Sequence, residues 1–191
     1  MTAPAYDEIA THEDLVVWSR DYCKEVRREW LVDVRFDLVE WEVSTRAKRR
    51  AAAVKRPKIP EAEVGSPVDW ETVEAAGGRR ADGRPFPATL SLTWDAFEAF
   101  ERTEWESTLR HELIHLEQYQ RCGTTDHGPE FKARAEELDT EVHCETFSDP
   151  KYVLRCESCD ALVAHRYRDC KLVRRADEYR SSCCESPLVV E

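Results

Sequence analysis

Apolar residues recur at helical spacing in three stretches of the chain, and each stretch predicts an amphipathic helix. The first covers residues 12–30, with the repeat Leu15, Trp18, Tyr22, Val26 and Trp30. The second covers residues 105–120, with the repeat Trp105, Leu109, Leu113 and Leu116. The third begins at Pro129, with the repeat Phe131, Ala135, Leu138 and Val142.

Residues that favour helix ends flank these stretches. Thr11, followed three residues later by Asp14, is the expected N-cap of the first helix. Thr93 is expected to cap a short helix over residues 94–102. Gly123 stands where the second long helix should end in a left-handed conformation.

Alternation of apolar and polar residues predicts short strands between the helices. The alternation that begins at Val34 shifts phase at Val39, which indicates a bulge or a strand that starts near Phe36. Residues 51–54 are expected to pair back on that strand as a hairpin, and residues 88–93 form a further strand.

Residues 57–87 contain five prolines and four glycines without a stable period. They predict a long surface loop, with a short helical turn over residues 70–75. Together, the elements predict an α+β fold with a main domain over residues 11–145 and a small module over residues 150–191.

The 191-residue chain has no run of 18 apolar residues and no signal-peptide pattern, so we expect a cytoplasmic protein without a membrane partner. Its net charge of −11, with 21 arginines and only 7 lysines, is typical of a high-salt cytoplasm such as that of a halophilic archaeon. Residues 46–58 nevertheless carry seven basic residues and no acidic one. Such a run is either a solvated face or a surface for nucleic acid.

The second long helix contains the pattern His-Glu-x-x-His. His111 and His115 lie one turn apart, so both imidazoles can reach one metal ion, whereas Glu112 is offset and can act on a bound water. This is the arrangement of zinc hydrolases. His127, in the loop before the third long helix, is the favoured third ligand. The alternatives are Glu136, Glu137, Glu141 and His143.

A metzincin would need Gly at position 118 and His at position 121, where this chain has Gln118 and Arg121. That class of protease is therefore excluded.

Cysteines are concentrated in the last forty residues. Cys156 and Cys159 form a C-x-x-C pair after a predicted strand over residues 152–155, with later strands over residues 161–167 and 188–190. Cys184 and either Cys183 or Cys170 would complete a structural zinc site, because Ser181 occupies the place of a regular fourth cysteine. The remaining thiols are expected to be ordinary buried or spare cysteines: Cys23, Cys122 and Cys144.

The segments HELIHLEQY and DHGPEFK together resemble the SprT-like metallopeptidase family over residues 11–145, with residues 57–87 as an insertion. The tail resembles the zinc ribbon that often follows that domain. The resemblance implies a zincin-like fold and a protease related to bacterial SprT and to Spartan, which degrades proteins crosslinked to DNA. It also implies a catalytic zinc held by His111, His115 and His127, with Glu112 as the catalytic acid and base.

Basic and aromatic residues predict a DNA partner, single-stranded or damaged, beside the protein substrates. The candidate contacts are Arg46, Lys48, Arg49, Arg50, Lys55, Arg56, Arg166 and Arg168. Two other interpretations stay open. One is a zinc-ribbon nucleic-acid adaptor with a silent protease-like site, and the other is a soluble zinc peptidase without a DNA role.

Overall fold

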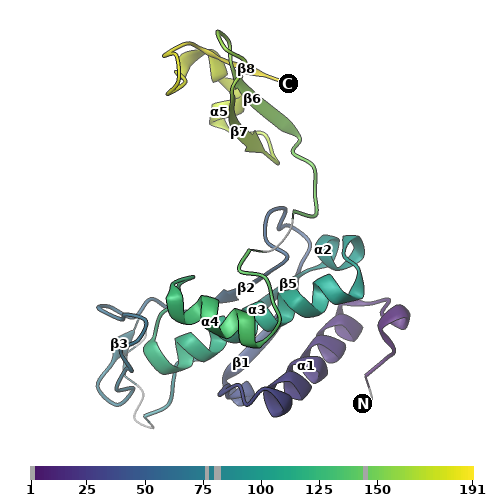
Figure 1. The fold of residues 1–191 in the computed structure, drawn as a ribbon, viewed down its shortest axis with the longest axis vertical. Helices are drawn as coiled ribbons and strands as arrows, with labels where there is room; N and C mark the ends of the chain where they lie inside the picture. The colour runs from purple at the N-terminus through teal and green to yellow at the C-terminus, as the bar shows by residue number, and fades with distance from the viewer. Residues whose placement is uncertain (1–2, 76–77, 80–82, 144–145) are drawn as a thin grey trace. The chain divides into compact units, whose positions relative to one another are not determined.

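The computed structural model describes residues 3–75, 78–79, 83–143 and 146–191. The chain divides into two compact units, Met1–Phe147 and Ser148–Glu191 (Figure 1). The first unit combines helices with a three-stranded sheet, and the second is built on a separate three-stranded sheet. The chain is therefore of mixed α and β class, as the sequence predicts.

The described residues of the first unit form four α-helices, all at or near their predicted places. They are α1 (His12–Glu29), α2 (Trp94–Ala99), α3 (Arg102–Cys122) and α4 (Pro129–Glu137). A 3₁₀ turn, η1 (Tyr6–Glu8), precedes them.

The predicted caps of α1 and α3 are confirmed. The Thr11 hydroxyl accepts the Asp14 N–H at 3.1 Å, and the Asp14 carboxylate accepts the Thr11 N–H at 2.9 Å, which completes a capping box. Gly123 ends α3 at φ +71°. At α2, however, the Thr93 hydroxyl donates to the Arg50 carbonyl at 2.7 Å and does not cap the helix.

Three strands form the sheet of the first unit in the order β1-β5-β2: β1 (Val39–Ser44), β5 (Ala88–Thr93) and β2 (Ala52–Lys55). Strand β1 pairs parallel with β5, and β2 pairs antiparallel with it. The predicted hairpin of β1 with β2 is therefore wrong. The central position belongs to β5, whose Leu90 and Leu92 are fully buried.

Two local predictions also need correction. The phase shift before β1 is a 3₁₀ turn, η2 (Phe36–Leu38), so the strand begins at Val39. Helix α4 ends at Glu137, and Asp139 has φ +49°, so Val142 lies beyond the helix.

Residues 57–87 are not simply a surface loop. Ile59 and Trp70 are buried in the main core, and the Trp70 indole N–H donates to the Gln120 carbonyl at 2.8 Å. Instead of the predicted helical turn continuing to residue 75, the segment has a two-stranded ribbon, β3 (Glu74–Ala75) with β4 (Gly78–Arg79). The segment thus contributes to the core beside the end of α3.

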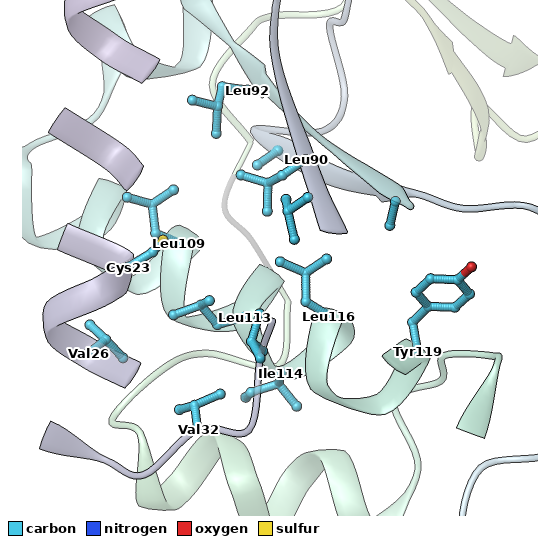
Figure 2. Packing of buried hydrophobic residues seen from close by; sticks show 14 of the residues in the cluster. Cys23, Val26, Val32, Leu90, Leu92, Leu109, Leu113, Ile114, Leu116 and Tyr119 are labelled. Carbon is cyan, nitrogen blue, oxygen red and sulfur yellow. The ribbon is translucent and has the colours of Figure 1, made fainter. Parts of the chain in front are cut away.

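Helix α3 is the central element of the core, in contact with β2, α1 and α4. Figure 2 shows Leu109, Leu113 and Leu116 of α3 among side chains from α1 and β5. All three leucines are fully buried, and each such side chain contributes roughly 1.5–3 kcal/mol to stability. The packing leaves the other side of α3, with its two histidines, for chemistry.

The second unit has a sheet in the order β7-β6-β8: β7 (Leu162–Arg166), β6 (Tyr152–Cys156) and β8 (Leu188–Val190). A short helix, α5 (Lys171–Arg174), and a 3₁₀ turn, η3 (Ala176–Glu178), complete it. Its buried apolar cluster consists of Leu154, Ala176 and Leu188. A core of this size is too small to support a fold alone.

None of the helices in the described part of the chain is both long and apolar enough to cross a membrane.

Candidate functional site

Three imidazoles converge at the side of α3. His111 and His115 come from successive turns of the helix, and His127 comes from the loop that precedes α4. The Nε2 atom of His127 lies 3.2 Å from that of His111 and 3.0 Å from that of His115. The structure thus brings together the three histidines that the sequence singles out.

Oxygen atoms fix the orientation of two of the rings. His111 Nδ1 donates to the Glu141 carbonyl at 2.9 Å, and His115 Nδ1 donates to the Gln118 side-chain oxygen at 3.3 Å. This pattern leaves the Nε2 lone pairs for a common ligand. Burial lowers the pKa of His111, and burial together with the nearby His111 charge lowers the pKa of His115 to about 4. Both rings are therefore neutral near pH 7, which is the metal-binding form.

The spacing of the three nitrogens suits a tetrahedral metal ion. Zinc–nitrogen bonds of about 2.0–2.1 Å separate neighbouring ligand atoms by about 3.3–3.4 Å, close to the distances at His127. Phe131 supports the cluster from α4, because its fully buried ring lies 4.6–4.8 Å from each of the three imidazole rings. The residues present therefore fit a zinc ion.

Hydrogen bonds hold the loop that carries His127. The Asp126 N–H donates to the Gln118 side-chain oxygen at 3.3 Å, and the Asp126 carboxylate accepts the Gly128 N–H at 2.9 Å. Arg56, which directly follows β2, donates to the hydroxyls of Thr124 and Thr125 at 3.1 and 3.4 Å. His127 is thus tied to α3 and to the segment that follows β2.

Glu112 is buried beside the triad and is only 4% exposed. The Val54 N–H of β2 donates to its carboxylate. Oε2 has no hydrogen-bond partner among the residues described. Burial raises the pKa of Glu112 to about 7, although the Val54 hydrogen bond and the Arg50 charge oppose the shift. Such a carboxyl can take up and release a proton near neutral pH.

A cleft of about 390 Å³ opens at these residues. Its lining includes His111, Glu112, His115 and His127, together with Arg49, Arg50, residues 51–54 and His143. The sequence did not predict that β2 forms a wall of the site. No sequence pattern indicated this position of β2, because it depends on β2 pairing with β5 rather than with β1.

The other candidates for the third ligand lie differently. Glu136 and Glu137 are exposed on α4, and Glu141 contributes its backbone carbonyl to His111. His143 lines the cleft, with its ring centre 5.8 Å from that of His127. Within the described chain, the histidine group that could hold an ion is His111, His115 and His127.

A second cluster gathers in the second unit, where four thiols lie within 4.8 Å of one another: Cys156, Cys159, Cys183 and Cys184. Cys159 Sγ and Cys183 Sγ are 3.5 Å apart. Of the two alternatives for the fourth thiol, the structure brings Cys183 to the cluster, and Cys170 is not in this group. Four converging thiols are the donor set of a structural zinc site.

Ser181 lies beside this cluster although it cannot supply a thiolate. Its hydroxyl, 2% exposed, donates to Cys156 Sγ at 3.2 Å. That hydrogen bond is the main cause that lowers the pKa of Cys156 to about 6. The serine therefore supports one ligand instead of being one. Cys23 and Cys122 are buried in the first unit, and Cys144 lies outside the described residues.

The basic residues singled out in the sequence fall into different settings. Lys48 pairs with Asp95, and Lys55 pairs with Glu42. Arg49 and Arg50 line the cleft, Arg56 holds the loop of His127, and Arg46 is exposed between β1 and β2. In the second unit, Arg166 lies on β7 and Arg168 is exposed just after it.

Comparison with protein-family models gives a match over most of the chain. The model of the SprT-like family matches residues 20–151, which is more than half of the chain. Neither the curated proteins nor the solved structures contain a match. The chain therefore belongs to the SprT-like family.

Proposed function

We propose that this chain is a zinc-dependent endopeptidase with a zincin-like domain over residues 11–145. Membership of the SprT-like family supports a metallopeptidase-like domain. The observation that carries the proposal is the buried Oε2 of Glu112, which has no hydrogen-bond partner among the described residues and lies beside three convergent imidazoles. A purely structural metal site does not need a buried carboxyl next to its ligands, since leaving such a group unpaired costs free energy.

His111, His115 and His127 would hold the zinc ion in this proposal. Zinc bound by three neutral imidazoles supplies Lewis acidity and lowers the pKa of water. Glu112 then accepts a proton from the attacking water at Oε2 and transfers it to the amine that leaves. The apolar surroundings of Glu112 keep its carboxylate a stronger base than an exposed one, and the Val54 N–H holds it in place.

Strand β2 supports a protein as the substrate. It is an edge strand of the sheet and its residues line the cleft beside Glu112. An extended polypeptide can add to such an edge through main-chain hydrogen bonds. The open cleft therefore suits a segment within a chain, which is what an endopeptidase requires.

The finer proposal is that the substrates are proteins associated with or crosslinked to DNA, as the resemblance to Spartan implies. Exposed arginines support it, because guanidinium groups suit phosphate contacts. The exposed candidates are Arg46 and Arg168, and Arg166 is half-buried on β7, whereas Lys48 and Lys55 already pair with carboxylates. Residues 150–191 would act as a zinc ribbon, with Tyr152, Tyr167 and Tyr179 available for base stacking.

The proposal is tested by cleavage of casein and of histones by purified protein, with and without single-stranded DNA. We expect cleavage that a zinc chelator abolishes and added zinc restores. Stimulation by DNA, with retarded DNA on a gel, supports the finer proposal. Cleavage that DNA does not change, without retardation, favours a peptidase without a DNA role. DNA retardation without any cleavage favours an adaptor with a silent site.

A further inference from the structure

Arg49 and Arg50 share one cleft with His111, Glu112 and His115. The Arg50 charge lies close enough to Glu112 to counteract part of the rise in its pKa that burial causes. Arg50 therefore lies within electrostatic reach of the place where a scissile bond would be held, and Arg49 lines the same cleft. Neither has a role in the mechanism proposed above.

The backbone that carries the two arginines is anchored, although their side chains are exposed. The Arg50 carbonyl accepts the Thr93 hydroxyl at 2.7 Å, and the Ala51 carbonyl accepts the Thr93 N–H at 2.9 Å. Ala51 and Thr93 are 1% and 2% exposed. Because these bonds tie the start of β2 to the end of β5, the arginines have a defined position at the cleft.

Among the described residues, neither arginine forms an ion pair with a carboxylate, whereas Lys48 and Lys55 of the same basic run are paired. The chain has 39 acidic and 28 basic residues, so it contains more carboxylates than are needed to pair with every basic side chain. Glu112 and Asp126, the acidic side chains that line the cleft, form no ion pair with either arginine in the described part of the chain. Glu112 accepts the Val54 N–H, and Asp126 accepts the Gly128 N–H.

We propose that Arg49 and Arg50 determine specificity, and that the cleft selects polypeptide segments with Asp or Glu beside the scissile bond. The inference rests on the proposed endopeptidase function and adds a substrate class to it. Guanidinium groups bind carboxylates through charge-assisted hydrogen bonds. An acidic polypeptide is favoured over a DNA strand here, because these arginines line the space that the reacting peptide must occupy.

Three internally quenched peptides that differ only in the residues flanking the scissile bond, Glu, Gln or Lys, test this directly. We expect kcat/KM for the Glu peptide to exceed that for the Gln peptide by about 5- to 10-fold, and the Lys peptide to be slowest. The preference should shrink at about 1 M salt, where the screening length falls to about 3 Å.

Two double variants give the test its controls. Arg49→Gln with Arg50→Gln should remove the preference, and Arg49→Glu with Arg50→Glu should invert it towards the Lys peptide. For each variant, the ratio of kcat/KM between two peptides is measured. A general loss of activity lowers both values and leaves this ratio unchanged. Arg20→Gln, on an exposed position of α1, removes one charge elsewhere and should keep the wild-type preference.

The outcomes separate this inference from the function on which it rests. If the wild type cleaves none of the peptides or protein substrates, the endopeptidase proposal fails. If it cleaves the Glu and Gln peptides equally well, only the specificity inference is overturned. It is also overturned if the Gln double variant keeps the preference and loses stimulation by single-stranded DNA, because the arginines then serve nucleic acid.

Discussion

At His111 and His115, one ring nitrogen donates to an oxygen while the other points towards His127. These partners select one tautomer and hold each ring in place before any ion binds. Ordering of this kind lowers the entropy lost on metal binding. At Glu112 the situation is reversed, because one buried oxygen has no hydrogen-bond partner in the part of the chain that the structure describes. That cost to stability is understandable if the oxygen takes part in chemistry.

Ser181 gives a prediction for the second metal centre. Substitution Ser181→Ala removes the hydroxyl that donates to Cys156 Sγ at 3.2 Å. We expect zinc affinity of the thiol cluster to fall by about 10-fold, because hydrogen bonds to metal ligands commonly contribute at least this much. Competition with a chromophoric chelator measures the effect. Ser182→Ala, at an exposed neighbouring position, is the control, and an equal loss in both variants would contradict the role of Ser181.

Residue spacing in the sequence predicts only part of the candidate site. The histidines of α3 and the loop-helix junction at His127 are local features, so their convergence could be anticipated. The choice between Cys170 and Cys183 could not be made, because it depends on the conformation of residues 181–186. There Glu185 has φ +52°, and the Ser181 N–H donates to the Ser186 carbonyl. Spacing alone does not encode such a turn.

Among the elements, the helices followed from sequence and the strand pairing did not. Periodicity and capping are local, so α1, α3 and the cap at Thr11 agree with the prediction. Strand pairing depends on segments that are distant in sequence. Strand β1 pairs with β5 and not with β2, although β2 is nearer to it in sequence. Trp70 was assigned to a surface loop for a similar reason. Prolines and glycines around it signal irregular backbone, which does not exclude a buried side chain.

Gly123 supplies a prediction at the end of α3. Its φ of +71° favours glycine, and an added Cβ would lie 3.1 Å from the Val68 side chain. We expect Gly123→Ala to lower the free energy of unfolding by at least about 1 kcal/mol. Gly123→Asn introduces the same Cβ but tolerates the left-handed conformation better, so its loss should be smaller. Chemical denaturation measures both, and an Ala variant as stable as the wild type would refute this account of the helix end.

At the scale of the whole molecule, the two units differ in what stabilises them. The first unit has an extended buried core, whereas the second has Leu154, Ala176 and Leu188 beside its four thiols. The area that the second unit can bury is small, so most of its folding free energy should come from metal binding. The net charge of the whole chain does not indicate that the two units are stabilised differently.

Removal of metal should therefore unfold the second unit and leave the first folded. All six tryptophans lie between residues 18 and 105, so tryptophan emission reports on the first unit alone. After treatment with a chelator, we expect unchanged tryptophan emission together with rapid proteolysis within residues 148–191. Zinc should restore resistance to the protease. Simultaneous loss of native tryptophan emission, or a second unit that stays resistant without metal, would contradict this division.

The central claim is that Glu112 is the proton-transferring group of a zinc endopeptidase. The most direct measurement is kcat/KM of a Glu112→Gln variant on one quenched peptide, at a zinc content per chain equal to that of the wild type. Glutamine keeps the shape but cannot accept the proton, so we predict a loss of about 100- to 10,000-fold with zinc retained. Equal kcat/KM in the two zinc-loaded proteins would contradict the account.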